Sequence, residues 1–239
     1  MLVAVLAAIL IGQSLDSSDL LPISAVIAAA PVGDLPLMPE KPPASPEGFN
    51  DCPPEGRGGD VELNRLTNRV DKAAYVPVSL ESILALTWPK STERRRMSQW
   101  TSSGRAFITR YQGIPIVVEG YIEGLREGVA EAANCVRGEP GLDLWRLSIV
   151  AESRGRRSQS VIAISTPQTR LGHTWAPDFI REVLIEGRRR VRLSGWLYFN
   201  PQSPQEIGRT RATLWEITPL MQIEVFEDGQ WNPLDKYGK

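Results

Sequence analysis

The segment "TRATLWEITPLMQIEV", residues 210–225, indicates the fold class. From position 215 to position 225, every odd position is apolar or proline, while most even positions are polar. A period of two is typical of a β-strand with one buried face. The run is longer than a typical strand of about five or six residues. Because Pro219 has no N–H to donate, we expect this strand to bend or bulge at its middle.

Four further segments are predicted strands, and one is a predicted helix. The strands are residues 114–122, 143–150, 160–166 and 191–199. The helix is residues 176–187, in which Pro177 suits the first turn and Gly187 the end. Along the chain the order is therefore β-β-β-α-β-β.

This order is that of an OB-fold, a five-stranded Greek-key barrel. Small barrels curl their strands at glycines and bulges, which gives Gly120, Gly195 and Pro219 a common explanation. We therefore predict a mainly β protein with an OB-like barrel over residues 111–234. Another small α+β or β-barrel arrangement is the alternative.

The rest of the chain divides into three parts before the barrel. Residues 1–30 contain the apolar run "LVAVLAAILIG", which has the length of a signal-peptide core and falls short of the ~20 residues that span a bilayer. We expect a signal peptide or a membrane anchor there, and export to the periplasm, cell envelope or outside. Residues 31–48 are rich in proline and predict a linker. Residues 49–110 are predicted to form an extension packed on the barrel, with a short helix that Ser79 caps.

The two cysteines, Cys52 and Cys135, are predicted to form a disulfide if the chain is exported. Closing a loop of about eighty residues would constrain the unfolded chain by ~4 kcal/mol in the entropy model. Two free thiols in a cytosolic protein are the alternative. Neither cysteine belongs to a C-x-x-C pair, so zinc and redox chemistry have no support.

Charge is unevenly distributed along the chain. Residues 1–87 hold five basic and eleven acidic side chains, whereas residues 88–239 hold twenty-two basic and seventeen acidic ones. The second half is therefore mildly basic.

Several short motifs resemble a family of uncharacterised exported bacterial proteins with an OB-like C-terminal half. They are "GFNDCP", "LNRLTNR", "VVEGYI", "NC", "VRLSGWLYFNP" and "RATLWEITP", within residues 48–234. The resemblance implies the fold and export but no activity. In that family the last motif is usually W-E-I-H-P, and a second histidine falls in the segment that matches "DLWRL". Here Thr218 and Arg146 occupy those positions, so a metal-binding or acid–base role for such histidines is not implied for this chain.

A ligand face is predicted on the outward side of the barrel. OB-folds bind along strands two and three and through the loops between strands one and two and strands four and five, here 124–142 and 200–210. Arginines with aromatic side chains suit single-stranded nucleic acid or another polyanion, and an oligosaccharide or an envelope protein is also open. The alternative is that residues 52–110 cover this face. The predicted ligand residues are Arg146, Arg192, Trp196, Tyr198, Arg209 and Arg211, and the loop between strands two and three adds Arg154, Arg156 and Arg157.

Catalysis is less favoured than binding, and we predict no cofactor and no metal. His173 is the only histidine, and it precedes a helix, where a turn or capping role is common. Four strand carboxylates could hold a divalent metal for a phosphodiesterase or nuclease if they converged, but each lies on the polar side of its strand. They are Glu119, Glu123, Glu216 and Glu224. A hydrolase and a structural envelope protein therefore remain the alternative functions.

Overall fold

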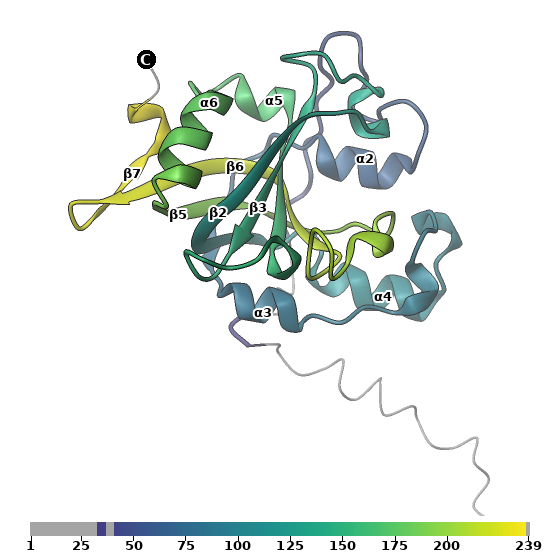
Figure 1. Ribbon diagram of the computed structural model, residues 1–239. Helices are drawn as coiled ribbons and strands as arrows, with labels where there is room; N and C mark the ends of the chain where they lie inside the picture. The colour runs from purple at the N-terminus through teal and green to yellow at the C-terminus, as the bar shows by residue number, and fades with distance from the viewer. Residues whose placement is uncertain (1–32, 37–40, 238–239) are drawn as a thin grey trace, which may run out of the picture. The chain divides into compact units, whose positions relative to one another are not determined.

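Strands dominate the computed structural model, which describes residues 33–36 and 41–237 (Figure 1). Seven strands form one mixed sheet, so the predicted mainly β class is confirmed. Their bounds are β1 (Val76–Pro77), β2 (Pro115–Val129), β3 (Leu144–Val150), β4 (Val161–Ser165), β5 (Arg190–Phe199), β6 (Trp215–Glu227) and β7 (Gln230–Pro233). The predicted signal segment, 1–30, lies outside the described residues.

The helices are short, and most begin at a side chain that caps their free N–H groups. They are α2 (Val61–Thr67), α3 (Leu80–Ala85), α4 (Ser102–Tyr111), α5 (Pro167–Arg170), α6 (Pro177–Phe179) and the π-helix η5 (Ile180–Glu186). Ser79 caps α3, as predicted, by accepting a hydrogen bond from the Ser82 N–H at 3.2 Å. Asp60 caps α2, which the sequence left unassigned. Within the described part of the chain, no helix has the length and hydrophobicity to cross a membrane.

Five of the seven strands follow the predicted order, with β2, β3 and β4, a helical segment, and then β5 and β6. The short strands β1 and β7 were not predicted. From β2 onward the sheet path runs β2-β3-β4-β6-β5, and β2 also pairs with β5, while β1 pairs with β2 and β7 with β6 at the margins. β4 and β6 are parallel, whereas the other neighbours on this path are antiparallel. The first half of β2 pairs with β5 over residues 115–121, and its second half pairs with β3 over residues 121–129. β2 is therefore long because it serves two partners.

The bend that Pro219 predicts lies in β6, opposite a glycine of β5. The pairing of β5 with β6 shifts register on both sides of Gly195, which faces Leu220. A Cβ atom on Gly195 would lie only 2.5 Å from the carbonyl oxygen of Pro219. Gly120 has the same role in β2, where a Cβ atom would lie 2.5 Å from the carbonyl oxygen of Val150. Both glycines permit a close backbone approach that any side chain would block.

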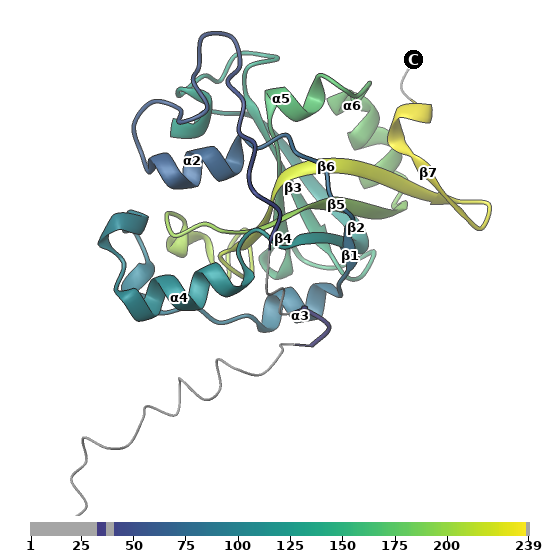
Figure 2. The ribbon, with the colours of Figure 1, turned by 180° about the vertical axis from the view of Figure 1, so that it is seen from behind.

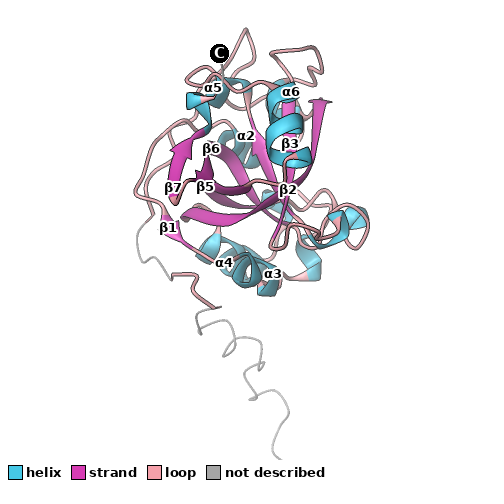
Figure 3. Ribbon diagram, turned by 60° about the vertical axis from the view of Figure 1, so that its left-hand side comes forward, coloured by secondary structure: helices cyan, strands magenta, loops and turns pink. Residues whose placement is uncertain are grey.

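The extension packs along the sheet and shares its core. Figures 1 and 3 show α3 and α4 along the lower side of the sheet, and Figure 2 shows the same helices from behind. Ile83 and Ile108, from α3 and α4, are fully buried in the same cluster as Leu193 and Ile217 of the sheet. Leu35, in the predicted linker, is only 1% exposed, so this described part of 31–48 packs on the domain and is not a free spacer.

The predicted disulfide is confirmed. Cys52 and Cys135 are bonded, with 5.8 Å between their Cα atoms and a sequence separation of 83. The bond joins the start of the extension to the loop between β2 and β3. It therefore links two parts of the chain that the sheet hydrogen bonds do not connect.

Candidate ligand-binding site

Two pockets adjoin each other on one side of the sheet. The larger, here the inner pocket, has a volume of about 670 Å³ and lies between α2, the segment 129–133, β3, β5, β6 and the loop 200–206. The smaller, the outer pocket, has a volume of about 310 Å³ and lies between β2, β3, β4 and the loop 205–210. Both pockets are lined by Arg126, Arg146 and Glu206. We call the two together the groove.

The groove is lined by parts of both loops that the sequence analysis named. The predicted loops 124–142 and 200–210 both contribute lining residues, and so do β3 and β4. The first of these loops is shorter than predicted, because residues 124–129 belong to β2. A small buried apolar cluster of Val129, Leu144, Ile162 and Ile164 underlies it. Three of these four side chains also line a pocket. The groove therefore has a packed apolar floor beneath its polar lining.

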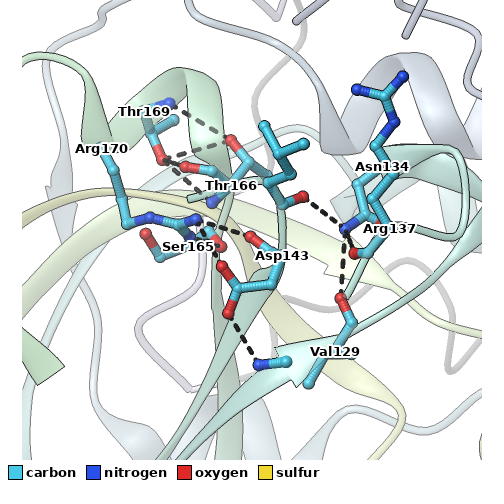
Figure 4. A network of polar contacts seen from close by, with 10 residues as sticks. Val129, Asn134, Arg137, Asp143, Ser165, Thr166, Thr169 and Arg170 are labelled. Atoms are coloured by element: carbon cyan, nitrogen blue, oxygen red, sulfur yellow. Dashed lines mark hydrogen bonds and ion pairs between the residues drawn. The ribbon is translucent and has the colours of Figure 1, made fainter. Parts of the chain in front are cut away.

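A network of hydrogen bonds fixes the loop that forms one wall (Figure 4). The Asn134 Nδ2 donates to the carbonyl oxygens of Val129, Arg137 and Leu142 at 3.2, 2.6 and 2.9 Å. The backbone N–H of Gly128 donates to the Asp143 carboxylate at 2.7 Å. These contacts tie both ends of the loop together, so this wall is formed before any ligand binds.

A buried ion pair supports the inner pocket from below. The Arg211 Nη1 donates to the Glu216 Oε1 at 2.6 Å, and the two side chains are 0% and 1% exposed. Asn200 donates to the same carboxylate at 2.9 Å, and the Thr218 hydroxyl lies 3.3 Å from its other oxygen. The Glu216 carboxylate therefore accepts hydrogen bonds from three protein side chains, and Arg211 has no exposed surface for a ligand.

A second ion pair stands at the junction of the two pockets. The Arg146 guanidinium donates to both carboxylate oxygens of Glu206, at 3.2 and 3.3 Å. Burial opposes the charge of Arg146, but the carboxylates of Glu216, Glu131 and Glu206 outweigh it and raise the pKa of the guanidinium. Arg146 therefore carries a positive charge between the pockets.

Glu131 lines the inner pocket and forms no ion pair with any other described residue. Burial raises the pKa of Glu131, and the nearby Glu216 carboxylate raises it further. Its carboxyl group is therefore shifted toward the neutral form, which can both donate and accept a hydrogen bond.

Five arginines on the rim of the groove are exposed and make no ion pair within the described part of the chain. Arg94 and Arg96 line the inner pocket, Arg126 lines both pockets, and Arg157 and Arg209 line the outer pocket. Most other arginines of the described residues pair with a carboxylate. The groove therefore has five cationic side chains on its rim that are free to bind an anion.

The structure divides the predicted ligand residues. Arg146 and Arg209 line the groove, and Tyr198 lines the inner pocket although it is only 8% exposed. Arg192 lies elsewhere, where it pairs with Glu119 at 2.9 Å. Arg211 is buried beneath the groove.

An open face that presents Trp196 and Tyr198 is absent, which corrects that expectation. Trp196 is 1% exposed because the extension covers it. The Arg69 guanidinium lies 3.3 Å from the centre of its ring, and the Tyr75 ring packs edge-on with 6.3 Å between centroids. The alternative, in which residues 52–110 cover these aromatics, therefore describes this part of the face.

The candidate catalytic groups have structural contacts. The His173 Nδ1 lies 2.8 Å from the Asp235 carboxylate, and its Nε2 lies 3.0 Å from the Met221 carbonyl oxygen. Glu119 bonds Arg190 and Arg192, far along the sheet from the buried Glu216. Over residues 33–36 and 41–237, no three acidic, histidine or cysteine side chains are grouped so that they could hold a metal ion.

Sequence reasoning missed Glu131 and the rim arginines 94, 96 and 126. Arg94 and Arg96 belong to the run "ERRRM", which has three basic side chains and one acidic one. This excess of positive charge could have indicated a site for an anion. Nothing in the sequence indicates that this run folds back against the loop 200–206, where the Arg94 N–H donates to the Pro201 carbonyl oxygen at 2.6 Å. A search of protein-family models and of curated proteins finds no match to this chain, so the resemblance to exported bacterial proteins stays a prediction.

Proposed function

We propose that the protein is an exported, OB-fold-like binding protein whose groove takes a phosphate-bearing polyanion, single-stranded nucleic acid. The pairing order supports the fold assignment. An OB barrel pairs its strands in the cycle 1-2-3-5-4-1, and β2, β3, β4, β6, β5 and again β2 are neighbours in that sequence. The groove then lies on the face and loops through which OB-folds bind oligonucleotides.

The observation that carries the proposal is the set of five exposed arginines without an acidic partner in the described part of the chain. A guanidinium presents a planar set of donors that matches a phosphate group. Because the two pockets adjoin, these arginines follow one continuous depression. Such a row suits a chain of phosphates better than one isolated anion.

The disulfide supports export, because disulfides persist in oxidising compartments. The apolar run at residues 2–12 suits the same destination. We therefore place the function outside the cytoplasm, where released nucleic acid would be the ligand.

Fluorescence anisotropy with a labelled single-stranded oligonucleotide tests the proposal. We expect binding that weakens roughly tenfold in Arg126→Ala and in Arg157→Ala, a loss of about 1.4 kcal/mol for one phosphate contact. Arg189→Ala is the matched control, because it removes the same charge from an arginine that pairs with Glu227 outside the groove.

Failure to bind any single-stranded oligonucleotide would reject the ligand class. Binding that Arg189→Ala weakens as much as Arg126→Ala does would reject the groove as its site. Binding of a neutral oligosaccharide without dependence on these arginines would favour a sugar ligand instead.

A further inference from the structure

The two pockets differ in charge, although they share a boundary. Four arginines and a single carboxylate line the outer pocket. The inner pocket is lined by four arginines and four carboxyl groups, those of Asp60, Glu131, Glu206 and Glu216. The outer pocket and the rim arginines therefore suit phosphates, whereas the interior of the inner pocket, where arginines and carboxyl groups are equal in number, suits a group without net charge.

The carboxylates of the inner pocket are mostly occupied by protein donors. Asp60 accepts hydrogen bonds from the N–H groups of Glu62 and Leu63 at 3.0 and 3.1 Å, and also from Met97. Glu216 is held by the donors described above. A ligand in this pocket therefore does not meet a free cluster of negative charge.

The remaining lining combines apolar surface with groups that can donate and accept hydrogen bonds. Leu63, Val129 and Ile164 give apolar contacts from three different elements. Glu131, whose carboxyl is shifted toward the neutral form, and the exposed Gln202 offer both donors and acceptors. This is the combination that recognises a flat, uncharged, polar ring.

We propose that the inner pocket receives the base of one unstacked nucleotide, while the neighbouring phosphates lie across the outer pocket and against Arg94 and Arg96 at the rim of the inner pocket. The inference rests on the proposed function and adds to it that the protein distinguishes nucleic acid from other polyanions. Arg126 and Arg146 stand between the pockets and bind the phosphate that joins the two parts. Glu131 and Gln202 contact the edge of the base.

The test compares two oligonucleotides of equal length and equal phosphate charge, one intact and one with abasic sugars throughout. We expect the intact strand to bind about tenfold more tightly, because each base bound by a protein contributes about 1 to 3 kcal/mol. Equal affinity for the two strands would overturn this inference and leave the proposed function standing. Absence of binding by both strands would overturn the proposed function and this inference with it.

Variants then test whether the preference for the intact strand arises in the inner pocket. In Glu131→Ala we expect the ratio of the two affinities to fall toward one, whereas Glu131→Gln keeps it because an amide still donates and accepts. Arg157→Ala is the control, since it should weaken both strands equally and leave the ratio unchanged. If melting shows that Glu131→Ala is not folded, Gln202→Ala gives the same test from an exposed position. A ratio that neither variant changes would place base recognition outside the inner pocket.

Discussion

At the scale of single residues, Gly195 decides whether β5 and β6 can cross closely. A Cβ atom there would lie 2.5 Å from the Pro219 oxygen and 2.6 Å from the Ile217 Cγ2. We expect Gly195→Val to lower the free energy of unfolding by about 1 to 3 kcal/mol or more, as overpacking does. Thermal denaturation measures the loss. Gly172→Val is the control, because nothing lies within 4 Å of its Cβ position, and equal losses in both variants would contradict the account.

The buried pair of Arg211 and Glu216 predicts a second single-residue effect. Arg211→Met leaves the Glu216 carboxylate buried without its counter-charge, so we expect a loss of about 3 to 5 kcal/mol in the free energy of unfolding. Adding Glu216→Gln should recover part of that loss. Urea denaturation of both variants tests this. A loss no larger than that of Arg65→Met, which breaks an exposed pair worth less than about 1 kcal/mol, would show that burial adds nothing here.

At the scale of elements, the segment that follows α2 holds the extension on β5. The Arg69 guanidinium lies over Trp196 and donates to the Asp71 carboxylate at 2.5 and 2.9 Å. Burial raises the pKa of Asp71, but the hydrogen bonds from Arg69 and from the Ser45 N–H outweigh it and hold the pKa below its usual value. The folded state therefore takes up this proton at lower pH than the unfolded state does.

This difference predicts how stability depends on pH. The contribution of Asp71 is complete above the unfolded pKa of about 3.9 and is lost as the pH falls through the lower folded pKa. We expect Asp71→Asn to be less stable than the native protein at neutral pH, and the gap between the two to close in acid. Urea denaturation at a series of pH values measures the gap. A gap that stays constant with pH would contradict the lowered pKa of Asp71. Asp178→Asn is the control, because it changes a fully exposed carboxylate.

The strands and helices also differ in how well the sequence could predict them. The five strands and the helical segment were predictable because each carries its own period or end signals, and 191–199 differs from the observed β5 by one residue at its start. The packing of residues 61–71 over β5 was not predictable. This segment has no clear periodicity, and its contacts with Trp196 join residues far apart in the sequence. A strand with both faces buried looks, in sequence, like one with an exposed aromatic face.

At the scale of the whole molecule, the disulfide joins the extension to a wall of the groove. Replacing Cys52 and Cys135 with serine should lower the free energy of unfolding by about 4 kcal/mol in the chain-entropy model. Ligand affinity should also fall, because the bond anchors the loop whose first residues, 129–133, line the inner pocket. Denaturation and oligonucleotide binding by the double variant test both effects. An unchanged denaturation midpoint would contradict the first, and unchanged affinity the second.

The location of the groove was predictable in part from the sequence, but its composition was not. The loops 124–142 and 200–210 were named from the order of elements alone, and both line it. Arg192 and Trp196 were placed on the same face because they share a side of one strand, yet only the far end of that strand reaches the groove. The rim residues Arg94 and Arg96 come from the extension, which the order of strands does not position.

The dependence of oligonucleotide affinity on salt tests the central claim, that the free arginines of the groove bind phosphates. For a single strand, the logarithm of the binding constant falls against the logarithm of the salt concentration with a slope of about −0.7 for each phosphate neutralised. Five arginines therefore predict a slope of about −3 to −4, and the double variant Arg126→Ala, Arg157→Ala should reduce its size by about 1.4. Arg189→Ala should leave the slope unchanged. A slope near zero, or one that the double variant does not alter, would contradict the account.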